Sequence, residues 1–132
     1  MIKKATNNDI RILAKMAAQL WDNHTVDELE NEFIETLNNQ QLIFFIKYLN
    51  NTPIGFAQCK LRTDYVEGTE SSPVGYLEGI FVKEDYRNKG YAKELLCACE
   101  KWAKDKGCKE FASDCELDNI DSFKFHIAMA FN

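Results

Sequence analysis

A polar loop between an apolar stretch and a helix-like stretch has the residue types of a phosphate-binding site. Residues 76–82 are apolar and aromatic, residues 87–92 read Arg-Asn-Lys-Gly-Tyr-Ala, and residues 93–103 repeat apolar side chains at helical spacing. This order predicts a strand, a loop and a helix. Gly90 and the small Ala92 let the backbone come close to a ligand, and amides at a helix start point toward an anion. We therefore expect phosphate binding here, although an ordinary surface turn uses the same residue types.

Glu78 is a second candidate for chemistry, because it is a carboxylate inside the apolar stretch 76–82. Burying a charged carboxylate without a partner is costly in free energy. Its presence therefore has three explanations. Glu78 belongs to a site, it faces solvent through the alternation of side chains along a strand, or it pairs with a lysine.

The rest of the chain predicts the elements that position these residues. Thr25 followed by Glu28 has the spacing of a capping box, and Thr6 followed by Asp9 resembles the start of an earlier helix. In chain order, the predicted elements are a strand at 1–5, helices at 10–21 and 26–37, strands at 41–49, 53–61 and 76–82, a helix from 93 to Gly107, a strand at 109–113, and a last helix from 119 or 121 through 129. The polar stretch 62–73 is expected to be a loop, and loops of this length are often functional.

Length and composition favour a single soluble domain. The chain has 132 residues, which suits one domain. No apolar run approaches the roughly 18 residues that span a bilayer, and the first residues lack the apolar core of a secretion signal, so a cytoplasmic protein is expected. The net charge of −5 argues against nucleic-acid and anionic-membrane partners and favours a cationic ligand.

The cysteines do not predict a metal site or a disulfide framework. There are 5 of them, an odd number, and no Cys-x-x-Cys pair occurs. Cys97 and Cys99 are two residues apart in a predicted helix, which points them to different faces. We therefore expect reduced thiols and no metal.

The loop Arg87-x-x-Gly90-x-Ala92 resembles the acyl-CoA pyrophosphate loop of the GCN5-related N-acetyltransferases. Three further segments are more specific: Asp-Tyr-Val-Glu-Gly-Thr-Glu-Ser-Ser-Pro at 64–73, Leu-Glu-Gly-Ile-Phe-Val at 77–82, and Lys-Gly-Cys-Lys-Glu-Phe-Ala-Ser-Asp at 106–114. Together they look like the aminoglycoside 6′-N-acetyltransferases of this superfamily, and the resemblance covers essentially the whole chain.

The resemblance implies an α/β (α+β) fold of the acetyltransferase type, in a single N-acetyltransferase domain over residues 1–132. The implied order is β-α-α-β-β-β-α-β-α, with a mixed central sheet flanked by about four helices. In this fold the sheet splays between the strand at 76–82 and the strand at 109–113, and acyl-CoA inserts into the splay.

The resemblance also implies the reaction: transfer of acetyl from acetyl-CoA to the 6′-amine of aminoglycoside antibiotics by direct attack in a ternary complex. Because an ammonium cannot attack a thioester, one proton must leave first, and Glu78 is the implied acceptor, directly or through water. Asp114 is implied as its catalytic partner in the acceptor pocket, with Tyr65, Trp21 and His24 as substrate contacts. Asp114 could equally be a turn or cap residue, and Trp21 and His24 could simply pack or cap.

Acetyl-CoA contacts are implied along the strand, in the loop and before the last helix. Backbone groups of Ile80 and Val82 are expected to pair with the pantetheine arm as another strand would, and the loop amides to hold the pyrophosphate. The full implied set is Ile80, Phe81, Val82, Arg87, Asn88, Lys89, Gly90, Tyr91, Ala92 and Asn119. For Asn119 a helix cap is a strong alternative.

The family fold normally closes with two more strands, whereas this sequence reaches its last residue where the last predicted helix would turn into them. The C-terminal strands are therefore expected to be missing, and the strand at 109–113 to expose an edge that a homodimer would cover. Two alternatives to the main function stay open: an acetyltransferase for another small amine such as a polyamine, and a truncated CoA-binding remnant without turnover.

Overall fold

A long antiparallel hairpin forms the middle of the sheet. In the computed structural model, which describes residues 1–63, 72–113 and 128–130, strands β2 (Leu42–Leu49) and β3 (Thr52–Arg62) pair in antiparallel register. Asn50 and Asn51 connect them with φ angles of 50° and 67°. Asn tolerates this left-handed region better than most residues, so the Asn-Asn pair fits a two-residue hairpin turn.

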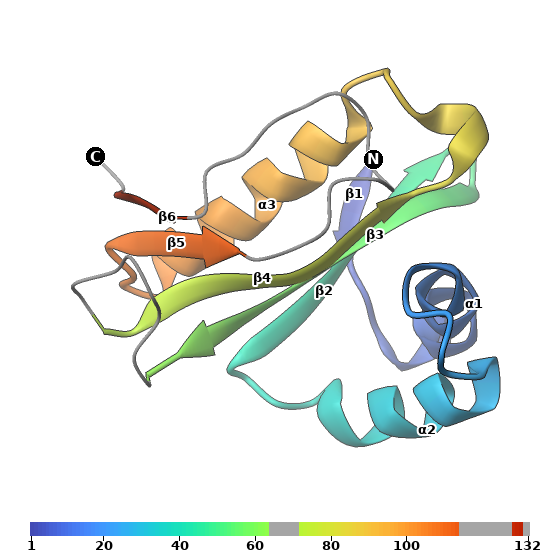
Figure 1. The fold of residues 1–132 in the computed structure, drawn as a ribbon, viewed down its shortest axis with the longest axis horizontal. Helices are drawn as coiled ribbons and strands as arrows, with labels where there is room; N and C mark the ends of the chain where they lie inside the picture. Colours follow the sequence, from blue (N-terminus) through green and yellow to red (C-terminus); the bar gives the residue numbers. More distant parts are fainter. Residues whose placement is uncertain (64–71, 114–127, 131–132) are drawn as a thin grey trace.

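The remaining elements extend this hairpin into one sheet with helices on both faces (Figure 1). They are β1 (Ile2–Lys4), the 3-10 turn η1 (Asn7–Asp9), α1 (Ile10–Leu20), α2 (Val26–Thr36), β4 (Val74–Val82), η2 (Glu84–Tyr86), α3 (Tyr91–Asp105), β5 (Glu110–Ser113) and β6 (Ala128–Ala130). The 6-stranded sheet has the order β1-β2-β3-β4-β5-β6. Its neighbours are antiparallel except β4 and β5, which run parallel.

Two hydrophobic cores hold the layers together. Helices α1 and α2 pack on one face of the sheet through residues such as Leu13, Phe33 and Phe56. Helix α3 packs on the other face, where Leu95 and Leu96 meet the alternate side chains of the central strands. Because both faces are covered, the central strands are apolar on both sides, as their sequence suggests.

Local signals for helix ends are confirmed. Thr25 and Glu28 form the predicted capping box at the start of α2, with each side chain bonded to the other residue's backbone N–H. The Thr6–Asp9 pair forms one too, but around a 3-10 turn that leads into α1. Gly107, with a φ of 92°, follows the end of α3.

The predicted fold class is confirmed, and the first eight predicted elements occur in the predicted order. The C-terminus differs. The last helix is predicted to run through Met129, but Ala128–Ala130 is a strand that pairs with Glu110–Ala112 of β5. The prediction that β5 exposes an edge is therefore wrong at Glu110–Ala112. Residues 114–127 lie outside the described part, and the part that is described has three α-helices where about four were expected.

Candidate active site

Glu78 stands on a β-bulge in the middle of β4. Gln58 of β3 faces Gly79, but the next residue, Cys59, faces Leu77, so Glu78 has no opposite residue in the register. Such an extra residue shifts the side-chain alternation by one. Leu77 before the bulge and Ile80 after it therefore pack into the same core beneath α3. Glu78 is the one residue of β4 that is not buried, because the bulge turns it out of the core.

Among the described residues, the pairing of β5 with β4 stops next to the bulge. β5 pairs with β4 at Gly75, Tyr76 and Leu77 and then ends at Ser113, whose hydroxyl donates to the Leu77 carbonyl at 3.2 Å. Beyond this point, β4 from Glu78 to Val82 has no β5 partner among the residues that the structure describes. An edge of this kind can hold an extended ligand through strand-like pairing.

A cleft of about 380 Å³ brings together three of the sequence-predicted acceptor residues. Trp21 and His24 follow α1, and Glu78 lies on β4, so residues far apart in sequence meet here. The Trp21 ring meets Phe56 edge-on, with centroids 6.0 Å apart. The other lining residues come from α2, β2 and β3: Leu29, Glu32, Thr36, Leu42, Gln58 and Lys60.

Gly79 allows Trp21 to lie directly against the bulge. A Cβ atom at Gly79 would stand 2.6 Å from Cζ2 of Trp21 and 3.0 Å from Cδ2 of Leu20. Contacts this short do not occur without movement of the neighbour, so the close approach requires glycine. Glu78 thus gives β4 its carboxylate, and Gly79 leaves room for the Trp21 ring beside it.

Lys60 forms an ion pair with Glu78, with Nζ 2.9 Å from Oε1. Pairing with a lysine, one of the three explanations for Glu78, is confirmed, and the pair lies in the cleft. Lys60 and Gln58 are lining residues that were not among the predicted site residues. Their polar types at alternate positions of an otherwise apolar strand place them on one face, which is the signal that could have found them.

The loop after β4 has the geometry of an anion-binding turn. Asn88 and Gly90 have φ angles of 62° and 84°, and α3 begins at the next residue, Tyr91. Left-handed residues before a helix start turn successive amides toward one side. A Cβ at Gly90 would meet nothing within 4 Å, so the protein itself leaves that space unfilled. The loop therefore fits the pyrophosphate of acetyl-CoA.

The Arg87 side chain fixes this loop to the sheet through two contacts. Arg87 donates its Nε–H to the Val82 carbonyl at 2.8 Å, and its guanidinium lies over the Phe81 ring at 5.8 Å. Val82, expected to pair with pantetheine, thus already has one carbonyl lone pair in use. Of the other predicted loop residues, Ala92 is buried, while Lys89 is exposed beside Asn88. The contacts of the Arg87 guanidinium with the Val82 carbonyl and the Phe81 ring keep the turn next to the end of β4.

Three of the described cysteines, Cys59, Cys97 and Cys108, have a thiol pKa that is raised and not lowered. Burial raises the pKa of Cys59 well above its ordinary value, and the adjacent Cys99 raises it further. Partial burial also raises the pKa of the exposed Cys97. Since a thiolate is the nucleophilic form, these shifts disfavour an acyl-cysteine route through them. No group of three His, Cys, Asp or Glu in the described part could hold a metal ion.

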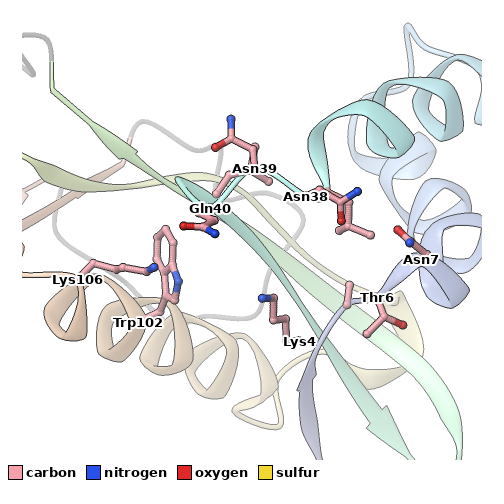
Figure 2. A pocket seen from close by; sticks show the side chains of 11 residues that line it. Lys4, Thr6, Asn7, Asn38, Asn39, Gln40, Trp102 and Lys106 are labelled. Carbon is pink, nitrogen blue, oxygen red and sulfur yellow. The ribbon is translucent and has the colours of Figure 1, made fainter.

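A larger hollow of about 620 Å³ lies elsewhere, between the end of β1, the α2–β2 connection and the end of α3 (Figure 2). Lys4, Trp102 and Lys106 line it together with neutral residues, and no carboxylate is among its lining residues. It contains none of the sequence-predicted site residues. A cationic acceptor fits the smaller, acidic cleft at Glu78 better.

Three predicted residues, Tyr65, Asp114 and Asn119, lie outside the described residues.

Within residues 1–63, 72–113 and 128–130, no helix combines the length and the apolar character required to cross a bilayer.

Comparison with known proteins identifies the family of the chain. Residues 10–131 match the model of the acetyltransferase (GNAT) family. The aminoglycoside N(6′)-acetyltransferase type 1 of Salmonella typhimurium is 43% identical over 113 residues, covering 86% of this chain and 78% of the relative. That of Stenotrophomonas maltophilia is 35% identical over 131 residues, covering 98% and 84%.

Solved structures give the same result. The aminoglycoside N-acetyltransferase AAC(6′)-Iy in complex with CoA superimposes with a TM-score of 0.85 at 38% identity, covering 90% of this chain and 78% of that one. The same enzyme with the bisubstrate analogue CoA-S-monomethyl-acetylneamine gives 0.84 at 38% identity, covering 90% and 81%. The chain therefore belongs to the GNAT family of acetyltransferases and, within it, to the aminoglycoside N(6′)-acetyltransferases.

Proposed function

We propose that this chain transfers the acetyl group of acetyl-CoA to the 6′-amine of aminoglycosides and so confers antibiotic resistance. The observation that carries the proposal is the position of Glu78, which lies on the bulge between an acidic cleft and the part of β4 that has no β5 partner among the described residues. The relatives of this chain carry the name aminoglycoside N(6′)-acetyltransferase, and one solved neighbour holds an analogue that joins CoA to an aminoglycoside.

Each residue has a proposed part in the reaction. Glu78, directly or through a water, takes a proton from the substrate ammonium, because only the neutral amine has a lone pair for attack. The amine nitrogen then forms a bond to the thioester carbonyl carbon, and the C–S bond breaks. The nitrogen loses its second proton, the departing thiolate gains one, and the products are the amide and the CoA thiol. Trp21, His24 and Tyr65 hold the acceptor, and Asp114 assists Glu78 in the acceptor pocket.

The donor side uses backbone more than side chains. When bound, acetyl-CoA supplies the activated acetyl group. Ile80, Phe81 and Val82 would hold its pantetheine arm along the open edge of β4, and the loop 87–92 would hold its pyrophosphate. Asn119 is proposed as a further contact to the arm. Residues 1–132 would act as one N-acetyltransferase domain.

The test is a thiol-release assay with acetyl-CoA and kanamycin or tobramycin. We expect CoA release that depends on both substrates, and mass spectrometry should place the acetyl group on the 6′-nitrogen. A folded sample that binds acetyl-CoA but releases no thiol with any aminoglycoside would refute the substrate assignment. A panel of other amines, including polyamines, then identifies the acceptor.

We also propose a cytoplasmic location and a homodimer. The described cysteines, Cys59, Cys97, Cys99 and Cys108, are free thiols, which suits a reducing compartment. The dimer cannot rest on an open edge of β5 at Glu110–Ala112, because β6 covers it. Sedimentation at micromolar concentration tests the dimer, and a monomer would refute it.

A further inference from the structure

The Lys60–Glu78 pair is half-exposed and lies where the substrate ammonium must bind. The two side chains are 41% and 28% exposed, and both line the cleft with Trp21 and His24. They extend from neighbouring strands, because Lys60 stands opposite Tyr76 in the β3–β4 register, two residues before Glu78. The ion pair therefore lies within the cleft, and Lys60 binds the carboxylate oxygen Oε1 of Glu78.

The two partners are not equally fixed. Glu78 is held by the backbone of the bulge, and its neighbour Gly79 lies directly against Trp21. Lys60 ends in a flexible four-carbon stem, and its exposed end has solvent to move into. Since exposed ion pairs contribute little free energy, the lysine is the member that can leave at small cost.

A substrate ammonium offers Glu78 the same charge and the same donors as Lys60 does. Among the lining residues of the cleft, Glu32 and Glu78 are acidic, Lys60 and His24 are basic, and Lys60 is the one that pairs with Glu78. A cationic acceptor that reaches Glu78 must therefore replace Lys60 or share the carboxylate with it. Replacement conserves the charge balance of the cleft, whereas sharing brings two cations together.

We propose that Lys60 is a specificity-determining residue that occupies Glu78 in the free enzyme and is displaced by the acceptor's ammonium. This inference rests on the proposed function, since it assumes that a cationic amine binds at Glu78. Acceptors with several ammonium groups can offset the displacement through the remaining acidic surface of the cleft. Lys60 thus weakens the binding of every amine that must displace it by the same free energy, which is a larger share of the binding free energy for an amine with no second contact.

The test compares Lys60→Met and Lys60→Gln, which remove the charge, with Lys60→Arg, which keeps it. Lys101→Met is the matched control, because Lys101 pairs with Asp105 at 3.1 Å on the exposed surface of α3, across the sheet from the cleft. It makes the same change in net charge. Circular dichroism confirms that each variant is folded. Two readouts are used: KM and kcat for kanamycin at saturating acetyl-CoA, and the calorimetric Kd for kanamycin.

We expect the KM and Kd for kanamycin to fall about three- to tenfold in Lys60→Met and Lys60→Gln, with kcat changed less than about twofold. Lys60→Arg and Lys101→Met should stay within about twofold of wild type. An unchanged or higher KM in the neutral variants overturns the proposal, as does a large fall in kcat at constant KM, which would make Lys60 a support for Glu78.

The proposed acetyl transfer and the proposed role of Lys60 can be refuted by different results. If the wild type turns over no aminoglycoside, the proposed function fails, while calorimetry still decides the role of Lys60. Tighter kanamycin binding by Lys60→Met than by wild type and Lys101→Met then supports displacement. Equal or weaker binding, or no binding by any variant, overturns it.

Discussion

At the scale of single residues, Glu78 and Gly79 make β4 different from an ordinary buried strand. The carboxylate leaves the core because of the bulge, and the missing Cβ of Gly79 admits the Trp21 ring. Each residue therefore has a separate physical role that a substitution can test.

Replacing Glu78 with Gln should lower kcat by about a hundredfold or more, because the amide has the same shape but cannot accept the substrate proton. The Kd for acetyl-CoA should stay within about twofold. Steady-state kinetics and calorimetry measure the two effects. Glu32→Gln, which removes another carboxylate of the same cleft, should raise the acceptor KM and leave kcat nearly unchanged. Equal losses of turnover and acetyl-CoA affinity in Glu78→Gln would contradict the assigned role.

Replacing Gly79 with Ala should destabilise the fold by about 1–3 kcal/mol, because the new methyl group would stand 2.6 Å from Cζ2 of Trp21. Urea denaturation measures the loss. The same substitution in a Trp21→Ala background should cost much less, since the ring that it meets is gone. Equal costs in the two backgrounds would show that Trp21 does not limit the space at Gly79.

At the scale of elements, the start of α1 depends on one buried carboxylate. Asp9 is 4% exposed and accepts hydrogen bonds from the Thr6 N–H at 2.8 Å and the Tyr48 hydroxyl at 3.1 Å. Its Oδ2 also lies 3.2 Å from Nζ of Lys3. Burial raises the pKa of Asp9, but the hydrogen bonds from Thr6, Lys3 and Tyr48 outweigh it, and the pKa is lowered overall from 3.8.

Because the folded pKa of Asp9 is below its unfolded value of 3.8, its ionised form stabilises the fold above that pH. This contribution is lost as the pH falls through the folded pKa. Asp9→Asn should therefore cost about 1–3 kcal/mol at pH 7 and progressively less below pH 3.8. Urea denaturation across this range measures the difference.

Asp27→Asn is the control for Asp9→Asn, because Asp27 has an 86% exposed side chain that pairs with Arg11 on the surface. Its cost at pH 7 should be under about 1 kcal/mol. A cost of Asp9→Asn that stays constant down to the most acidic pH would contradict the linkage.

At the scale of the whole molecule, the loop before α3 is tied to the sheet through the start of that helix. Lys47 of β2 is buried and bonds Glu94 in the first turn of α3, with Nζ 2.8 Å from Oε1. The Lys47 ammonium also lies 5.1 Å from the centre of the Tyr91 ring. These contacts hold the start of α3, and with it the loop 87–90, against the sheet. Binding at the loop should therefore stabilise the fold as a whole.

Acetyl-CoA at about 100 times its Kd should stabilise the protein by about 2.7 kcal/mol and raise its Tm by several degrees. Scanning fluorimetry measures the shift. Inorganic pyrophosphate at the same concentration controls for ionic effects and should give a much smaller shift. A folded sample with no shift in millimolar acetyl-CoA would contradict the donor site and with it the proposed reaction. A shift without thiol release would indicate a CoA-binding protein that does not turn over.

Much of the fold follows from the sequence, because its signals are local. Apolar periodicity identifies β2, β4 and α3, the Thr25–Glu28 spacing predicts the start of α2, and Asn50–Asn51 predicts the hairpin turn. These signals lie in residues a few positions apart, so they can be recognised without knowing which distant segments pack against them. The strand at Ala128–Ala130 shows the limit, because its helix-like sequence pairs with β5 instead.

The sequence by itself determined the loop before α3, the carboxylate inside β4 and the family to which these residues belong. Only the tertiary structure decided that Glu78 stands on a bulge, that Lys60 forms an ion pair with the Glu78 carboxylate, and that the Trp21 ring lies against Gly79. The physical reason is the range of the interactions. A bulge is a mismatch between two strands, and an ion pair across strands depends on their register, so neither exists until distant segments have paired.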